Sequence, residues 1–307
     1  DIEISEVGPR DGLQSLASIM ATEDKMAWIK AQFETGTREI EVGSFVSPKL
    51  LPQMADTPEV VAFATSLKGL TVAALVPNLK GLRNAIASGA HKLSIPFSVS
   101  ETHSLKNLGK SHAQMFDEIQ ACIDFLDTLA KPMRPHFEVG LSTAFGCSME
   151  GAVPAKKVIG IAERVMLMGV DEVCLSDTTG YGNPRQVQLL AQGIWVHCGR
   201  EALRSIHLHN TRGQGLANAL MAVEIGITTI DSSLGGIGGC PSAPGASGNI
   251  VTEDLVFLLE SMGLNTGIDL RALLAVRTQV AQALPQEVLY GFTAAAGVPL
   301  GFGSVDL

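Results

Sequence analysis

The chain has 307 residues, of which 46% are hydrophobic and 5% aromatic, and its formal net charge is −9. That length suits one large α/β domain or two smaller ones, and the negative charge argues against nucleic acid or an anionic membrane as the main partner. Five scattered cysteines without a Cys-x-x-Cys pair argue against a disulfide framework and a structural zinc site. No apolar run reaches the roughly 18 residues of a membrane span, so we expect a soluble cytoplasmic protein.

Short apolar strands alternate along the chain with longer segments of helical pattern. The first strand lies within residues 2–8 and ends in a turn at residues 8–12. Further strands are expected at 38–43, 70–76, 92–97, 136–142 and 172–177, around His207 and His209, and at 227–233. Helices are expected after Thr22, up to residue 88, over about 111–130 after a polar loop, and after Pro154 and Pro184, where proline suits the first turn.

Eight strand-then-helix units in about 235 residues predict a parallel sheet closed into a (β/α)₈ TIM barrel. The alternative is an open doubly wound sheet, but no Gly-x-Gly-x-x-Gly follows the first strand. We expect a single domain over 1–307, with the barrel at about 1–250. The C-terminal segment, about 251–307, reads as two further helices that could cover the barrel or form an oligomer contact.

His207 and His209 stand two residues apart near the end of the seventh strand. Side chains at i and i+2 of a strand share one face, so both imidazoles can reach one metal ion. The alternative is a pair of histidines on a half-buried strand, satisfied by their neighbours. Two ligands alone do not make a site.

The other strand ends supply further polar groups, which a barrel brings to one mouth. Asp11, His207 and His209 would form a set of one carboxylate and two imidazoles with open positions, and Asn249 could add an oxygen. Mixed nitrogen and oxygen ligands without a thiolate fit Mg²⁺ or Mn²⁺, although imidazoles would also suit Zn²⁺.

Arg10, Glu41 and Asp177 also lie at strand ends. Arg10 could act on the substrate or pair with a neighbouring acid. Glu41 and Asp177 are candidates for catalysis, and equally for structural carboxylates that hold Arg10 or the histidines. Ser44 and Thr178 fall at the same mouth and are expected, with Gln14, to contact the substrate.

Cys240 lies in a glycine-rich segment, residues 235–249, after the eighth strand. A polar loop offers a buried thiol no packing role, so we interpret the segment as a lid that delivers a catalytic group. A phosphate cradle is the alternative, which the Cys-Pro pair and the missing lysine disfavour.

Several segments in this order carry a family pattern: residues 7–14 (Val-Gly-Pro-Arg-Asp-Gly-Leu-Gln), 41–49, 52–56, 207–214, 238–241 and 245–254. The chain resembles the 3-hydroxy-3-methylglutaryl-CoA (HMG-CoA) lyases, within a superfamily of TIM-barrel metallolyases and Claisen-type synthases. The resemblance implies a divalent-metal-dependent retro-Claisen cleavage to acetyl-CoA and acetoacetate, a role in leucine degradation, and a homodimer.

The resemblance also implies roles for individual residues. Asp11, His207, His209 and Asn249 match the metal ligands, and Arg10 matches the arginine that stabilises the oxyanion. Cys240 matches the mobile-loop thiol that helps to protonate the enolate, while Glu41 and Asp177 match supporting acids. The general base stays open between His207 and Asp177.

Alternatives within the superfamily are a Claisen-type synthase and a pyruvate aldolase, which share the Arg-Asp and His-x-His pieces but do not require Cys240. A barrel without activity, kept as a scaffold, is a further alternative. The chain departs from the family pattern at Ser15, at Gly140, where a tyrosine is usual, and at Ser242. The lost aromatic ring would open space near C3 of the substrate, and we therefore hypothesise a larger or different acyl group.

Overall fold

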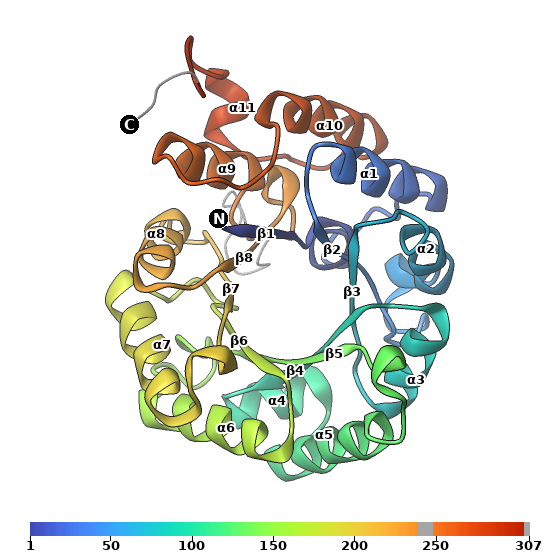
Figure 1. Cartoon of the computed structure of the whole chain (residues 1–307), viewed down its shortest axis with the longest axis vertical. Coiled ribbons are helices and arrows are strands. Elements are labelled where there is room, and N and C mark those ends of the chain that lie inside the picture. The colour runs from blue at the N-terminus through green and yellow to red at the C-terminus, as the bar shows by residue number, and fades with distance from the viewer. Residues whose placement is uncertain (239–247, 304–307) are drawn as a thin grey trace.

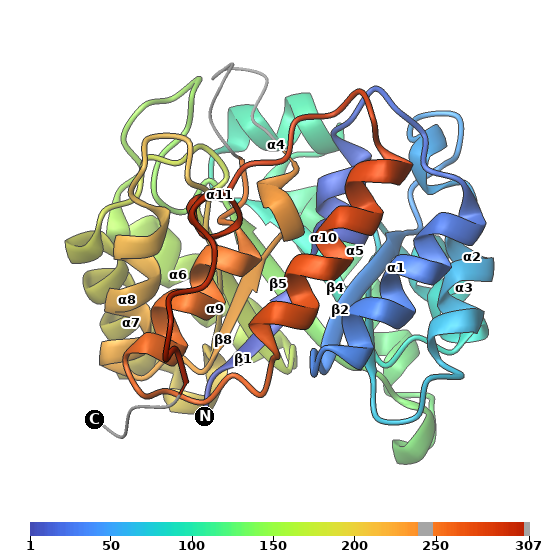
Figure 2. The ribbon, with the colours of Figure 1, turned by 90° about the horizontal axis from the view of Figure 1, so that it is seen from above.

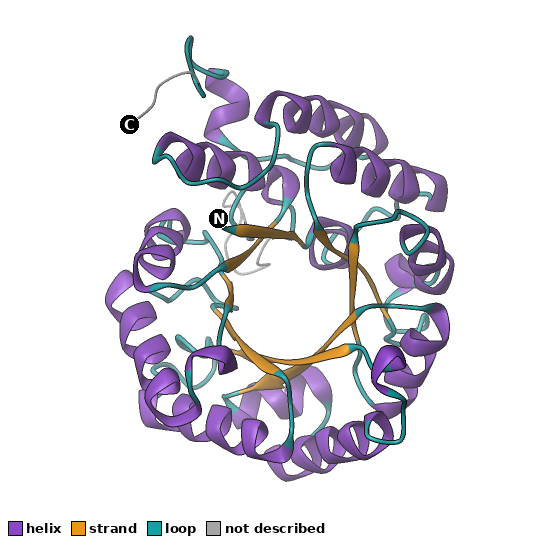
Figure 3. Ribbon diagram, viewed as in Figure 1, coloured by secondary structure: helices purple, strands orange, loops and turns teal. Residues whose placement is uncertain are grey.

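The computed structural model describes residues 1–238 and 248–303, and these residues form one closed barrel of eight parallel strands (Figures 1 and 3). The strands follow one another around the barrel in chain order, and β1 pairs with β8 to close it. The predicted TIM barrel is confirmed. The open doubly wound sheet is excluded, because such a sheet would leave two unpaired edges.

Each predicted strand is present, with ends within a few residues of those expected. The strands are β1 (Glu3–Glu6), β2 (Glu39–Ser44), β3 (Thr71–Leu75), β4 (Lys92–Ser98), β5 (His136–Ser142), β6 (Glu172–Ser176), β7 (Ser205–His207) and β8 (Thr229–Ser232). β7 is shorter than predicted, so His209 follows the strand and forms an isolated antiparallel bridge with Asn249.

Helices surround the barrel (Figure 1). After β1 to β7 these are α1 (Thr22–Glu34), α2 (Thr57–Ala64), α3 (Leu79–Ser88), α5 (His112–Leu126), α6 (Ala155–Met168), α7 (Pro184–Cys198) and α8 (Gly215–Ile225). Local capping sets where two of them begin: the Asn78 side chain accepts from Gly81 N, and Ser111 forms a reciprocal capping box with Gln114.

Two segments differ from the sequence prediction. The turn expected at residues 8–12 is one turn of π-helix, η1 (Gly8–Gly12). The polar loop expected between β4 and α5 contains a short helix, α4 (Glu101–Leu108), whose N-cap Ser100 accepts from His103 N. Composition alone did not reveal α4 because two of its eight residues carry charge and only one is buried.

Three helices, rather than the two expected, follow residue 251: α9 (Thr252–Ser261), α10 (Leu270–Ala283) and the short α11 (Phe292–Ala296). α9 follows β8 and the short 3-10 helix η5 (Leu234–Gly236) along the chain and lies beside α8, and α10 packs against α1, which Figures 1 and 2 both show. Within the described residues, no helix combines the length and apolar character needed to cross a membrane.

The strands separate an apolar outer surface from a polar interior. On β4, Leu93 and Ile95 are buried in the hydrophobic layer under the helices, while Lys92, Ser94 and Pro96 line the inside of the barrel. Strand side chains alternate between the two faces, so the same division runs through β2, β5 and β6. The hydrophobic core therefore lies between strands and helices, and the inside of the barrel is left for polar groups.

Candidate active site

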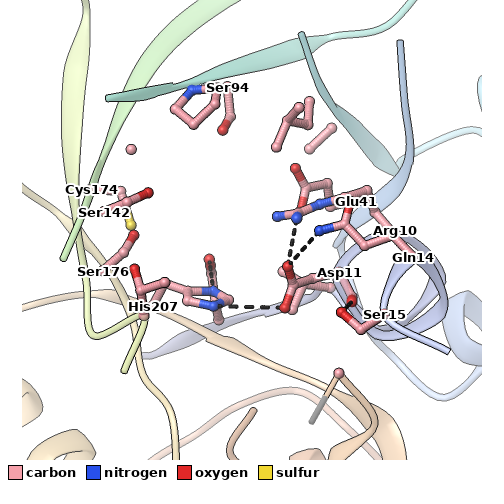
Figure 4. Close-up of a pocket in the computed structure, with 18 of the residues that line it drawn as sticks. Arg10, Asp11, Gln14, Ser15, Glu41, Ser94, Ser142, Cys174, Ser176 and His207 are labelled. Atoms are coloured by element: carbon pink, nitrogen blue, oxygen red, sulfur yellow. Dashed lines mark hydrogen bonds and ion pairs between the residues drawn. The ribbon is translucent and has the colours of Figure 1, made fainter. Parts of the chain in front are cut away.

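A cavity of about 730 Å³ opens at the C-terminal ends of the strands and extends into the barrel (Figure 4). Leu50 and Asn107, from the segments after β2 and β4, line its outer part. Lys92, the first residue of β4, lines its inner end. Active sites of TIM barrels are built at this face, and the cavity is therefore the candidate active site.

Arg10 and Asp11 reach the cavity because η1 turns the chain directly after β1. The amides of Arg10, Asp11 and Gly12 all donate to the carbonyl of Val7, at 3.1, 2.7 and 3.3 Å. A single π-helical turn re-aims side chains and is frequent at functional sites. Gly8 allows the turn, since a Cβ there would lie 2.7 Å from the Trp28 ring.

Asp11, His207 and His209 bring three ligand atoms within 4.8 Å of one another. Nε2 of His207 lies 3.1 Å from Nε2 of His209 and 3.9 Å from Oδ2 of Asp11. Two ring nitrogens this close require a hydrogen on one of them or a cation within reach of both lone pairs. The structure therefore brings these three predicted metal ligands together.

The protonation states of this group suit a cation. Burial, together with neighbouring His207, lowers the pKa of His209 to about 4, so its ring is neutral at pH 7. Burial disfavours ionisation of Asp11, but Arg10 and the histidines outweigh it and lower the pKa of Asp11. A carboxylate and a neutral imidazole are the forms in which these groups bind metal.

Asn249, the fourth predicted ligand, lies beside Asp11. Its Nδ2 donates to Oδ2 of Asp11 at 2.8 Å and to the carbonyl of Ile237 at 3.0 Å. Its Oδ1 is buried and has no hydrogen-bond partner among the described residues, and the same holds for Nδ1 of His209. An orphaned amide oxygen, a carboxylate and two imidazoles fit a divalent ion with nitrogen and oxygen ligands.

Arg10 is held on the cavity wall by two carboxylates. Its Nε lies 2.6 Å from Oε2 of Glu41, and its Nη1 lies 2.6 Å from Oδ1 of Asp11. Burial opposes the charge on Arg10, but these two acids raise its pKa, so the guanidinium stays charged. Of the two roles expected for Arg10, the structure shows the pairing with neighbouring acids. This pairing also holds the positive charge of the guanidinium at a fixed position on the cavity wall.

Asp177 does not line the cavity, and its direct role in catalysis stays a prediction. Its Oδ1 accepts from Tyr181 N at 2.9 Å and its Oδ2 from Gly182 N at 3.0 Å, and it is 1% exposed. Along β6, Cys174 and Ser176 face the interior, so Asp177 falls on the opposite face. Burial raises the pKa of Asp177 to about 6, and the carboxyl holds the loop after β6.

Ser44, predicted to bind substrate, also lies outside the cavity. Its amide donates a hydrogen bond to Thr57 Oγ1 at 3.1 Å, and its own Oγ accepts from Val46 N at 3.4 Å. The register of β2 against β3 shifts between Glu41 and Gly43, so that Gly43 pairs with Ala74 and Ser44 pairs with Leu75. Ser44 is the last residue of β2, as its predicted place at a strand end requires, and substrate contact by Ser44 stays a prediction.

Gln14 and Thr178 both line the cavity, as expected. Gln14 Nε2 donates to Oδ1 of Asp11 at 3.2 Å, and Thr178 Oγ1 accepts from Thr143 N at 2.9 Å. Cys240 and Ser242 lie outside the described residues, so the expected lid thiol has no position in this structure.

Sequence reasoning missed four charged residues that line the cavity: Glu39, Lys92, Glu138 and Asp231. Asp231 Oδ2 lies 3.1 Å from Nδ1 of His207, and Lys92 Nζ lies 3.2 Å from Oε2 of Glu138. The sequence does contain a signal for these residues, because each is a charged residue within an otherwise apolar strand. Its position alternates with buried apolar neighbours, which indicates a side chain directed into the barrel.

A family model described as HMGL-like matches residues 1–280. A hydroxymethylglutaryl-CoA lyase of Bacillus subtilis is 39% identical over 295 residues, which span 95% of this chain and 97% of that protein. A cytoplasmic 3-hydroxy-3-methylglutaryl-CoA lyase of Rattus norvegicus is 39% identical over 92% of this chain and 81% of its own length. The structure of an HMG-CoA lyase of Acinetobacter baumannii with coenzyme A and 3-methylmalate matches with a TM-score of 0.90 and 37% identity, over 99% of this chain and 98% of that chain.

Proposed function

The chain belongs to the HMGL-like family of carbon–carbon lyases, and on that basis we propose that it cleaves HMG-CoA, or a close 3-hydroxyacyl-CoA, to acetyl-CoA and acetoacetate or the matching 3-keto acid. The observation that carries the proposal is the meeting of Asp11, His207 and His209 beside Arg10 on one wall of a deep cavity. A thioester substrate agrees with the relative solved with coenzyme A.

We assign Asp11, His207 and His209 as the ligands of a divalent metal ion, with Asn249 as a further oxygen ligand. A bound divalent ion would act as a Lewis acid and polarise the oxygens of the substrate. The family depends on a divalent metal, and we propose Mg²⁺ or Mn²⁺, since the set contains hard oxygen ligands and no thiolate.

In the proposed reaction a base removes the proton of the C3 hydroxyl, the C2–C3 bond breaks, and C3 becomes a ketone. The bonding electron pair moves into the thioester as an enolate, which then takes a proton at C2. The buried, permanently charged guanidinium of Arg10 would stabilise the enolate oxygen. Glu41 would keep Arg10 in place, through the 2.6 Å contact to its Nε.

We propose that His207 takes the hydroxyl proton at Nε2 while that nitrogen is released from the metal ion, which Asp11, His209 and Asn249 would then hold. His207 lines the cavity and is 8% exposed, whereas Asp177 has both carboxylate oxygens engaged by backbone amides. Asp231 would hold the His207 ring through Nδ1. Cys240 is the proposed proton donor to C2. Gln14 and Thr178, which line the cavity, are the proposed substrate contacts.

We also propose a cytoplasmic homodimer. The location follows from the scattered cysteines and from the cytoplasmic rat relative, while other relatives are mitochondrial. The dimer follows from family resemblance, and sedimentation of the purified protein would test it.

The decisive experiment measures acetyl-CoA release from (S)-HMG-CoA with Mg²⁺, with and without a chelator. We expect release that the chelator abolishes and that added Mg²⁺ restores. No release of acetyl-CoA from any 3-hydroxy-3-alkylglutaryl-CoA, by a folded protein that binds Mn²⁺, would reject the proposal.

A further inference from the structure

The interior of this barrel is open beyond the Asp11 and His207 pair. TIM-barrel interiors are usually filled by layers of bulky Val, Ile and Leu side chains. Here the inward positions of β4, β5 and β6 that line the cavity are mostly small: Ser94, Pro96, Gly140, Ser142, Cys174 and Ser176. The cavity therefore continues past the candidate metal ligands toward Lys92.

Gly140 keeps the middle of this cavity open. A Cβ placed on Gly140 would meet nothing nearer than Oγ of Ser94, at 4.0 Å, and its backbone is extended within β5. The backbone therefore does not require glycine at this position. The missing side chain simply leaves volume in the cavity.

The side chains of Ser94, Ser142 and Ser176 form a hydroxyl wall, which faces Arg10, Asp11 and Glu41 across the cavity (Figure 4). Figure 4 draws no hydrogen bond from these three hydroxyls to another of the residues shown. Ligand pockets use a few such polar groups to orient what they bind. The hydroxyl wall can therefore donate to, or accept from, a polar group that enters the interior.

The inner end of the cavity is charged but already paired. Lys92 Nζ lies 3.1 Å from Oε1 of Glu39 and 3.2 Å from Oε2 of Glu138, and Asp231 also lines the cavity. One ammonium thus faces several carboxylates, so a further carboxylate would meet repulsion in a poorly solvated site. An uncharged group avoids that repulsion.

The orientation of a thioester follows from the shape of the cavity. Coenzyme A is bulky and polar and must stay toward the open mouth, near Leu50 and Asn107. Asp11 and His207, where C3 would lie, come next along the wall. A substituent on C3 is then the part of the substrate that can extend further inward, along the wall formed by Gly140 and the three serines.

We propose that this chain acts on a 3-hydroxyglutaryl-CoA whose C3 substituent is longer than methyl, uncharged, and hydrogen-bonding, such as a hydroxyalkyl chain, and that the barrel interior binds this substituent. The proposal rests on the lyase function proposed above and names the acyl class that the same site accepts.

A panel of four thioesters on the same skeleton tests it, with methyl, n-butyl, 4-hydroxybutyl or 3-carboxypropyl at C3. We expect kcat/KM to be highest for the 4-hydroxybutyl compound, by about tenfold over methyl, because contacts of a few methylenes discriminate on this scale. A higher kcat/KM for methyl, n-butyl or 3-carboxypropyl would overturn the assignment. Cleavage of none of the four would instead reject the lyase function.

Two variants distinguish the effect of the interior volume from the effect of the hydroxyl groups. Gly140→Leu fills the interior and should lower kcat/KM for the 4-hydroxybutyl compound about tenfold or more relative to methyl. Ser94→Ala should lower the ratio of kcat/KM for the 4-hydroxybutyl compound to kcat/KM for the n-butyl compound. This variant provides the test if Gly140→Leu does not fold. The matched control is Gly160→Leu, on the exposed side of α6, where nothing lies within 4 Å. Unchanged substrate ratios in both interior variants would contradict the proposal.

Discussion

Nδ1 of His207 lies 3.1 Å from Oδ2 of Asp231, and the two residues are directly paired in the register of β7 and β8. Because Asp231 engages Nδ1, the other ring nitrogen of His207 faces His209 and Asp11. A carboxylate behind a metal-binding histidine fixes the tautomer and the orientation of its ring. Asp231 is in this sense a positioning residue for the candidate metal cluster.

Asp231→Asn should weaken Mn²⁺ binding by about 10- to 100-fold, the usual effect of losing such a partner. The amide keeps the size of the side chain but loses its charge. Calorimetric titration with Mn²⁺ measures this without any turnover, with exposed Asp24→Asn as the control. Unchanged Mn²⁺ affinity would remove Asp231 from the positioning role.

Arg10→Lys should lower kcat about 10²-fold or more, with little change in the fold. Lysine keeps a positive charge but cannot contact Glu41 and Asp11 together through a planar fork. Steady-state kinetics, with Arg38→Lys as an exposed control, measure the effect. A loss of less than about threefold would show that the charge alone suffices.

Adding Mn²⁺ at about 100 times its dissociation constant should stabilise the folded protein by about 2.7 kcal/mol, and a chelator should remove that gain. His209→Ala removes one of the three clustered ligands and should abolish most of the stabilisation. Thermal unfolding provides the readout, with exposed His197→Ala as the control. Equal stabilisation of wild type and His209→Ala would place the ion elsewhere.

Asp177→Ala should lower the free energy of unfolding by about 1–3 kcal/mol, because two buried backbone amides, of Tyr181 and Gly182, lose their acceptor. Asp177→Asn keeps one acceptor oxygen and should recover part of the loss. Denaturant titration measures both variants. Full stability of Asp177→Ala together with abolished turnover would support the direct catalytic role predicted for Asp177.

Burial, with further carboxylates nearby, raises the pKa of Glu138 from its ordinary 4.5 to about 7. The folded state therefore holds the proton more tightly than the unfolded state, and the resulting stabilisation is complete below pH 4.5 and lost as pH rises through 7. Between pH 5 and 8 the wild type should lose about 1–3 kcal/mol more stability than Glu138→Gln. Parallel pH profiles for both proteins would refute this, with exposed Glu59→Gln as the control.

The fold and the meeting of Asp11, His207 and His209 were predictable from the sequence, since the signals are local. Apolar strands alternate with helical segments, and His207 and His209 stand two residues apart beside a strand end. A closed parallel barrel then brings Asp11, more than 190 residues away in the chain, to the same mouth.

The direction of side chains at strand ends was not predictable in the same way. Ser44 follows a register shift in β2, and Asp177 lies one position past the end of β6, where a change of one residue moves a side chain to the other face. Asp231 was visible as an acid within an apolar strand, but its contact with His207 depends on the register between β7 and β8.

Lys92 and Glu39 line the interior cavity and also a second pocket of about 240 Å³ near the N-terminal ends of the strands. A barrel interior with a pocket at each end contributes few packing contacts. The folded state of this barrel therefore depends for its stability on the apolar layer between strands and helices. Substitutions inside the barrel should then be tolerated far better than substitutions such as those of Leu93 or Ile95 beneath the helices. A protein arranged in this way is free to explore new acyl groups during evolution while its architecture stays intact.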